Sequence, residues 1–120
     1  ILGAQAESRG LKLSDLMPHG TSHWLGIDVH DVGSYDDPSD SARQARVSKR
    51  RLLEPGMIIT VEPGIYIKKN VKRVPARYRG IGIRIEDDIL ITENGNTVLT
   101  SAVPKTVQEI ETLMQGASSR

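Results

Sequence analysis

The residue types best suited to chemistry in this chain are three histidines and two glutamates. All of its histidines lie in one segment, HGTSHWLGIDVHD, as His19, His23 and His30. Glu62 and Glu86 each follow apolar, β-branched residues, where an unpaired carboxylate would be costly. Imidazole nitrogens and carboxylate oxygens together form the mixed ligand shell of many divalent metal ions. The set therefore predicts a metal site.

Each of these features also has an ordinary structural interpretation. A single histidine beside Trp24 is more often a core or surface residue than a ligand. Arg84 and Glu86 are two residues apart in a strand-like segment, so they would share a face and could form a simple ion pair. Asp87 and Asp88 fit a strand-end bend or a salt bridge. The concentration of three histidines with two internal glutamates favours the metal site.

The tripeptide Glu-Pro-Gly occurs twice, and its two glutamates are expected to differ. Pro55 and Gly56 fit the central positions of a type II turn, so we expect Glu54 to face water. Glu62 instead follows the apolar run 57–61. A charged carboxylate there loses several kcal/mol of hydration unless a cation meets it. Glu62 therefore needs a cationic partner.

Strands are expected to carry the glutamates. The apolar, β-branched runs at 57–61 and 65–67 predict strands, and alternation over 81–92 predicts one long strand. Asn94-Gly95 predicts a hairpin turn before a further strand at 97–99.

Helices are expected towards the two ends of the sequence. Residues 1–9 have the pattern of a helix that ends at Gly10. Residues 106–114 repeat apolar side chains on one helical face, and Thr106 can cap this helix together with Glu109. Both helices flank the segments that carry the candidate ligands.

Composition limits the class of protein. The 120 residues suffice for one modest domain, and 16 Lys and Arg against 15 Asp and Glu give a net charge of +1. This balance favours neither nucleic acid nor a membrane surface, so neither partner is expected. The absence of cysteine excludes disulfides and thiolate chemistry, and we expect a reducing, cytoplasmic location. Residues 36–51 are polar and predict a surface loop.

Three separated motifs occur in order and together resemble a known family. HGTSHWLGIDVHD, LLEPGMIITVEPGIYI and RYRGIGIRIEDDILIT resemble the aminopeptidase P branch of the pita-bread metallopeptidases, which also include prolidase and methionine aminopeptidase. The resemblance runs from about His19 to Met114. It implies an α+β fold, the C-terminal portion of a pita-bread (creatinase/aminopeptidase-like) fold with antiparallel strands and flanking helices. It also implies a Xaa-Pro aminopeptidase, a hydrolase that removes the residue preceding proline at the second position of a peptide.

The resemblance assigns roles to individual residues. It implies that His23, Glu62 and Glu86 are metal ligands that share two divalent ions, manganese in this branch. His30 would hydrogen-bond the substrate and stabilise charge at the tetrahedral stage. His19 would lie on the proline side of the substrate pocket.

Two catalytic roles remain within the implied site. Arg84 would orient a ligating carboxylate through charge-assisted hydrogen bonds. Glu62 would also serve as the general base, because a ligand beside the activated water can take its proton.

The sequence departs from the family at its two aspartate ligands. Only Glu7 and Asp15 precede His23 among the acids, and neither fits. We therefore expect residues 1–120 to be the C-terminal part of a single pita-bread domain whose N-terminal half is a required partner. By itself the chain should form an incomplete, inactive site. A homo-oligomer is left open.

Two other functions are kept as alternatives. A prolidase-type dipeptidase would share the same motifs. A non-catalytic pita-bread module could instead bind a peptide or protein through a basic run, although a solvated loop is the simpler interpretation of that run. The run consists of Arg43, Arg46, Lys49, Arg50 and Arg51. Retention of all three implied ligands favours an enzyme.

Overall fold

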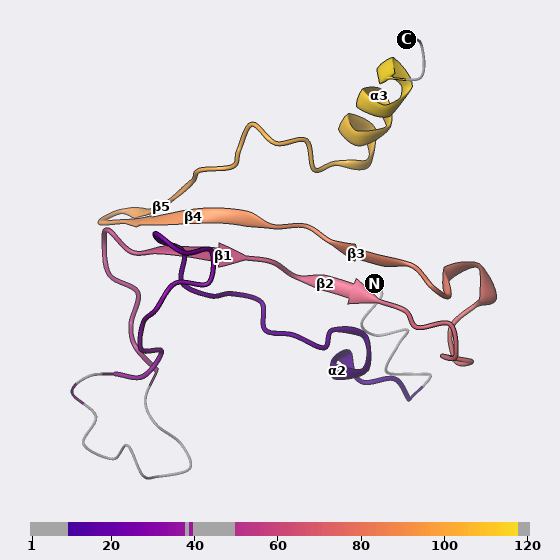
Figure 1. The fold of residues 1–120 in the computed structure, drawn as a ribbon, viewed down its shortest axis with the longest axis horizontal. Coiled ribbons are helices and arrows are strands. Elements are labelled where there is room, and N and C mark those ends of the chain that lie inside the picture. The colour runs from indigo at the N-terminus through magenta and orange to yellow at the C-terminus, as the bar shows by residue number, and fades with distance from the viewer. Residues whose placement is uncertain (1–9, 38, 40–49, 118–120) are drawn as a thin grey trace. The chain divides into compact units, whose positions relative to one another are not determined.

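The computed structural model of the chain describes residues 10–37, 39 and 50–117 (Figure 1). The chain forms two compact units. The first takes its described residues from Ile1–Ser22 and Val61–Glu86, and the second from His23–Thr60 and Asp87–Arg120. The helix expected at 1–9 and most of the polar loop expected at 36–51 lie outside the described residues. Within the described residues, no helix is long and apolar enough to cross a bilayer.

The first unit is built on a two-stranded antiparallel sheet. Strand β2, Gly64–Tyr66, pairs with β3, Gly82–Arg84, and places Ile65 opposite Ile83. Between the two strands the chain forms a short 3-10 helix, η1, Ala76–Tyr78. The sequence predicted a strand at 65–67, one residue later than the structure places β2.

A short helix that the sequence analysis did not expect lies against β2. This helix, α2, spans Leu13–Leu16 and contacts the strand. Leu11 and Leu16 are the buried hydrophobic side chains among the described residues. The Asp15 carboxylate accepts a hydrogen bond of 2.9 Å from the Lys12 backbone N–H, which satisfies one donor at the start of the helix. Asp15 thus helps to cap α2.

The three-stranded sheet has the order β1-β4-β5 (Figure 1). Strand β1 is Ile58–Val61, β4 is Asp87–Thr92 and β5 is Gly95–Val98. Strands β4 and β5 form an antiparallel hairpin in which Thr92 lies opposite Gly95. The hairpin predicted from Asn94-Gly95 is confirmed, although its second strand begins at the glycine itself.

The single long strand expected over 81–92 is wrong. The structure divides this segment into β3 and β4, which belong to different sheets. Ile85 still donates its backbone N–H to the carbonyl of Pro63, at 3.3 Å, whereas Leu99 donates to Asp88 at 2.8 Å. The change of pairing partner between Ile85 and Asp88 ends one strand and begins the next. Side-chain alternation continues through the break, so the sequence pattern did not reveal it.

The first Glu-Pro-Gly unit forms the predicted turn. Met57 donates its N–H to the carbonyl of Glu54 at 3.1 Å, and Gly56 has a φ of 92°. A positive φ after proline is the geometry of a type II turn. The side chain of Glu54 is 64% exposed, as expected.

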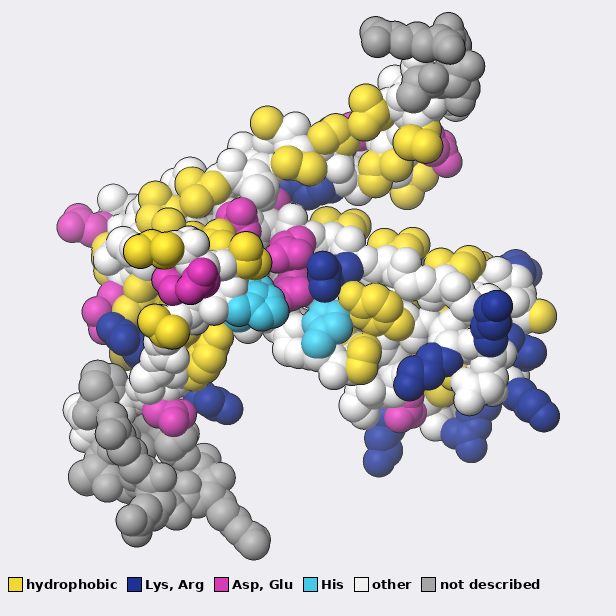
Figure 2. Space-filling view, viewed as in Figure 1, with side chains coloured by type: hydrophobic (Ala, Val, Ile, Leu, Met, Phe, Trp, Pro, Cys, Tyr) yellow, Lys and Arg dark blue, Asp and Glu magenta, His cyan; other side chains and the backbone are white. Residues whose placement is uncertain are grey.

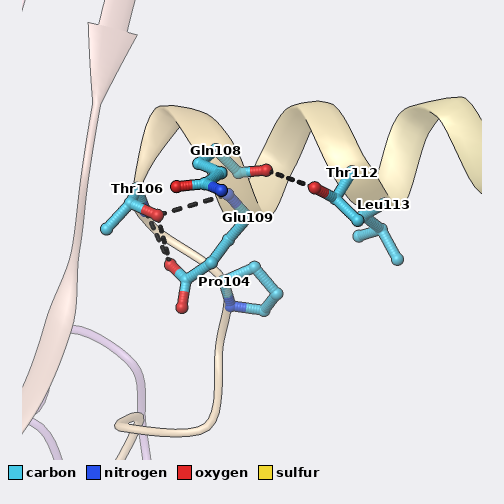
Figure 3. Close-up of a pocket in the computed structure, with 6 residues that line it drawn as sticks. All are labelled: Pro104, Thr106, Gln108, Glu109, Thr112 and Leu113. Atoms are coloured by element: carbon cyan, nitrogen blue, oxygen red, sulfur yellow. Dashed lines mark hydrogen bonds between the residues drawn. The ribbon is translucent and has the colours of Figure 1, made fainter.

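Helix α3, Val107–Ala117, confirms the predicted C-terminal helix and its cap. The Glu109 carboxylate accepts from the N–H of Thr106 at 2.9 Å, and the Thr106 hydroxyl accepts from the N–H of Glu109 at 3.2 Å. Figure 3 shows this reciprocal capping box at the side of an open hollow, where Thr112 also donates to the carbonyl of Gln108. The side-chain oxygens of Thr106, Glu109 and Thr112 drawn there are therefore used by the helix itself.

The apolar face of α3 is exposed (Figure 2). Its members are Val107, Ile110, Leu113 and Met114, which are between 44% and 72% exposed. The spacing of these residues is the helical period that the sequence analysis used, because residues three and four apart share a face.

Candidate metal centre

In the first unit, two carboxylates share one arginine. Glu62 directly follows β1, and its backbone N–H donates to the carbonyl of Thr21 at 2.8 Å. Its carboxylate lies 3.6 Å from Nη1 of Arg84, and the carboxylate of Glu86 lies 3.5 Å from Nε of the same guanidinium. The side chain of Glu62 is only 11% exposed. Arg84 is therefore a cation of the kind that Glu62 requires.

The pairing of β3 with β2 places Arg84 beside these carboxylates. Arg84 ends β3 and lies opposite Gly64, two residues after Glu62, in the antiparallel register. Its guanidinium is about half exposed, and a planar fork of donors suits two carboxylates at once. The arrangement balances a pair of like charges that would otherwise repel each other.

In the second unit, His23 has a defined ring orientation. Its Nδ1 lies 2.9 Å from the carbonyl oxygen of Trp24. A carbonyl only accepts, so this contact places the proton on Nδ1 and leaves the lone pair on Nε2. Hydrogen bonding of one ring nitrogen to a backbone carbonyl is the usual support of a histidine that ligates metal through the other nitrogen.

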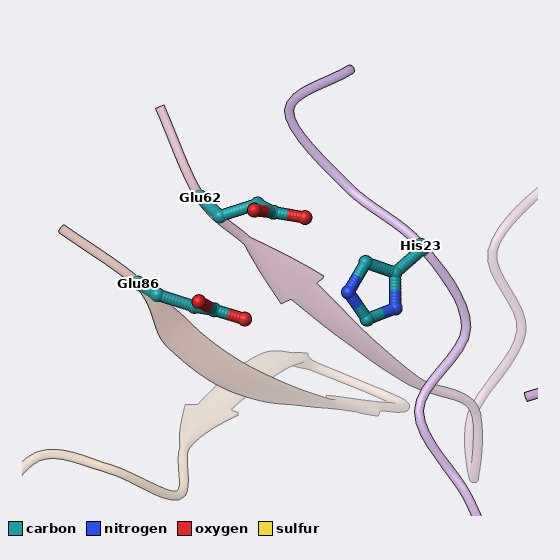
Figure 4. A group of neighbouring side chains, drawn as sticks. All are labelled: His23, Glu62 and Glu86. Carbon is teal, nitrogen blue, oxygen red and sulfur yellow. The ribbon is translucent and has the colours of Figure 1, made fainter. Parts of the chain in front are cut away.

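Figure 4 draws the three residues that the described chain offers as metal ligands, His23 of the second unit and Glu62 and Glu86 of the first. The donor set of one imidazole and two carboxylates suits divalent ions such as manganese, cobalt, iron or zinc. These residues thus fit the group that the resemblance implies.

The other two histidines lie outside the helices and strands, one in each unit. The ring of His30 is 4.1 Å from the ring of His23, centroid to centroid, and His30 is exposed in the second unit. In the first unit, Nδ1 of His19 lies 2.6 Å from the carbonyl of Gly20, so Nε2 accepts from the hydroxyl of Tyr66 at 3.0 Å. His19 therefore has a settled partner on β2, which the sequence analysis did not identify.

Gly64 makes the contact between His19 and Tyr66 geometrically feasible. A Cβ at this position would lie 2.7 Å from the Tyr66 ring and 3.1 Å from Nε2 of His19. Real side chains do not approach so closely, so the second Glu-Pro-Gly unit needs its glycine for close packing. The first unit needs its glycine for the turn instead.

Asp87 and Asp88 have structural roles, in agreement with the ordinary interpretation of a strand-end bend or a salt bridge. The Asp87 carboxylate accepts from Nζ of Lys105 and from the hydroxyl of Thr100. Lys105 first, and Thr100 second, hold the pKa of Asp87 below its ordinary value by stabilising the charged form. The N–H of Asp88 donates to the same hydroxyl at 3.1 Å. These contacts fix the start of β4, immediately after Glu86.

The basic run considered for partner binding is partly engaged in the second unit. Arg50 pairs with Asp36 at 3.4 Å, and the guanidinium of Arg51 lies 6.0 Å from the centre of the Trp24 ring. Arg43, Arg46 and Lys49 lie outside the described residues.

The chain matches the model of metallopeptidase family M24 over residues 3–93. It is 57% identical over 99 residues to a Xaa-Pro aminopeptidase of Escherichia coli, which covers 82% of this chain and 20% of that protein. It is 42% identical over 123 residues to a human Xaa-Pro dipeptidase, covering 83% of this chain and 24% of that protein.

The structure is similar to a solved member of the same family. Against aminopeptidase PepP of Pseudomonas aeruginosa the TM-score is 0.77 at 50% identity, over 90% of this chain and 22% of that one. The expected fold, a portion of the pita-bread architecture with antiparallel strands and helices, is confirmed. The chain spans about 20% of the length of the curated Xaa-Pro aminopeptidases that it matches. The family match covers most of the sequence and includes His23, Glu62 and Glu86, so the chain belongs to metallopeptidase family M24.

Proposed function

We propose that the protein containing this chain is a metallo-aminopeptidase that removes the first residue of peptides with proline in second position. One observation carries the proposal: Glu62, only 11% exposed, and Glu86 both lie against the guanidinium of Arg84, in a chain that also offers His23 as a metal ligand. The similarity to Xaa-Pro aminopeptidases supports the choice of substrate. Manganese and a dinuclear centre belong to the proposal, with the further ligands supplied by residues outside this chain.

The three ligand residues would hold the metal through Nε2 of His23 and carboxylate oxygens of Glu62 and Glu86. When bound there, divalent ions would supply two effects, a lower pKa of water and polarisation of a carbonyl group. Glu62 is the proposed general base, because its buried carboxylate can accept a proton and return it. Its pairing with Arg84 keeps the carboxylate oriented for that transfer.

The remaining histidines are proposed to handle the substrate. His30 is exposed beside His23, where it can donate a hydrogen bond to the peptide carbonyl and stabilise the negative charge that develops there. His19 is held by Tyr66 and is proposed to border the proline pocket. Neither residue has to carry the metal in this arrangement.

The two Glu-Pro-Gly units provide the sharpest test. In the complete protein, Glu62→Gln should lower kcat/KM for a Xaa-Pro tripeptide by at least about 100-fold, the usual contribution of a general base. Glu54→Gln is the matched control, since Glu54 is a 64% exposed turn residue and should leave turnover nearly unchanged. Release of the free N-terminal amino acid is measured. Similar activities of the two variants would contradict the assignment.

A dipeptidase is the second candidate, because the human relative at 42% identity is named a Xaa-Pro dipeptidase. The same assay separates the two functions when a Xaa-Pro dipeptide and a Xaa-Pro tripeptide are compared at equal concentration. Preference for the tripeptide supports the aminopeptidase. If the complete protein with excess manganese cleaves neither peptide, the non-catalytic binding module is favoured.

A further inference from the structure

We propose that Thr60 is a positioning residue for the ligand His23, an inference that rests on the metal site proposed above. Thr60 lies in the middle of the apolar run of β1, yet its side chain carries a hydroxyl. Thr60 is only 1% exposed. Among the described residues, its side chain is the one that is fully buried. Burying a hydroxyl group costs free energy unless the hydroxyl forms a hydrogen bond, so the partner of this hydroxyl is informative.

The hydroxyl of Thr60 is bonded to the backbone of His23. The N–H of His23 donates to Oγ1 of Thr60 at 3.1 Å, and the N–H of Thr60 donates to the carbonyl of His23 at 2.9 Å. One residue therefore contacts both the backbone N–H and the backbone carbonyl of His23. The next backbone bond on this side runs from Leu25 to Ile58 at 3.1 Å, so the pairing is continuous beyond the ligand.

These contacts fix the point from which the imidazole extends. The two bonds to Thr60 hold the main chain of His23, and the bond from Nδ1 to the carbonyl of Trp24 sets the rotation of its ring. Together they determine where Nε2 lies. Groups that orient a ligand in this way change metal affinity by about 10–100-fold when they are removed.

Valine would fill the same space without accepting a hydrogen bond. Threonine and valine are nearly equal in volume and equally β-branched, so packing in β1 alone does not explain the hydroxyl. Serine keeps the acceptor but loses the methyl group. The pair of substitutions therefore separates the hydrogen bond from the packing.

The test uses the complete protein with manganese ion as the probe. The Thr60→Val variant should bind Mn²⁺ about 10–100-fold more weakly than the unaltered protein, and Thr60→Ser should remain within about three-fold of it. Free Mn²⁺ is quantified by its electron paramagnetic resonance signal during titration. Thr97→Val is the matched control, because Thr97 is an exposed residue of β5.

A second readout does not depend on the metal. Hydrogen exchange of the His23 amide in the metal-free protein should be faster in Thr60→Val than in Thr60→Ser, because only serine retains the acceptor. If Thr60→Val does not fold, Thr60→Ala replaces it, and the same order relative to Thr60→Ser is expected.

The possible failures are distinguishable. Absence of Mn²⁺ binding by the unaltered protein contradicts the proposed metal site. Tight binding by that protein with equal affinity in Thr60→Val, or equal amide exchange in the valine and serine variants, overturns the positioning role of Thr60 alone.

Discussion

At the scale of single residues, burial separates side chains that look alike in the sequence. Glu54 and Glu62 both begin the tripeptide Glu-Pro-Gly, but their side chains are 64% and 11% exposed. The sequence predicted this difference because Glu62 ends an apolar run and Glu54 precedes one. The hydroxyl of Tyr66 was missed, since nothing in the spacing of Tyr66 and His19 indicates that they meet. A threonine inside an apolar strand was the available signal for Thr60.

The glycine of the second unit gives a prediction at this scale. Gly64→Ala should lower the free energy of unfolding by about 1–3 kcal/mol, because the new Cβ would lie 2.7 Å from the Tyr66 ring and force it to move. The displacement would also break the hydrogen bond between Tyr66 and His19. Thermal denaturation of the complete protein measures the change.

Gly20→Ala is the control for this substitution. A Cβ at Gly20 would meet its nearest heavy atom, the carbonyl oxygen of Ser22, at 4.0 Å, which is an ordinary contact distance. Its melting temperature should stay close to that of the unaltered protein. Equal effects of the two substitutions would show that the close approach at Gly64 is relieved without cost.

At the scale of elements, local signals were predictive and pairing partners were not. The type II turn at Gly56, the hairpin at Gly95 and the capped helix α3 all depend on residues a few positions apart, and all three were predicted. The division of 81–92 into β3 and β4 depends on which distant segments donate and accept hydrogen bonds. Alternating isoleucines are compatible with either result, so the sequence could not locate the break.

The capping box of α3 predicts a pH dependence. Hydrogen bonds from the backbone N–H of Thr106, from its hydroxyl and from the N–H of Lys105 lower the pKa of Glu109 below its ordinary value of 4.5. A carboxyl group with a depressed folded pKa is protonated first in the unfolded helix. Its stabilisation is therefore complete above about pH 4.5 and is lost as the pH falls through the lower folded value.

Amide hydrogen exchange along α3, corrected for intrinsic rates, measures this effect. Protection in the unaltered protein should fall several-fold as the pH is lowered below the ordinary pKa of Glu109. In Glu109→Gln this part of the pH dependence should be absent. Glu111→Gln removes the same charge from the same helix outside the capping box, and it should leave the pH dependence intact. A Glu109→Gln profile identical to the unaltered one would contradict the role of the cap.

At the scale of the whole molecule, the described residues leave much apolar surface uncovered. Leu11 and Leu16 are their buried hydrophobic side chains, whereas eighteen large hydrophobic side chains among them are exposed. A stable domain of this size normally buries most of its apolar residues. The chain also spans only about 20% of the length of related aminopeptidases. On both grounds we propose that neighbouring protein surface is needed to complete the folded state.

The last prediction is that the 120 residues, purified alone, will not cleave a Xaa-Pro tripeptide even with excess manganese. Three protein ligands would leave a metal loosely held, and the exposed Ile83 of β3 together with the apolar face of α3 costs stability while these side chains face water. The chain should therefore bind a hydrophobic dye and unfold without a sharp transition. The complete protein, assayed at the same metal concentration, should release the N-terminal amino acid and show a cooperative transition. Metal-dependent turnover by the 120 residues alone would refute this view, because it would mean that their three ligands already form a working site.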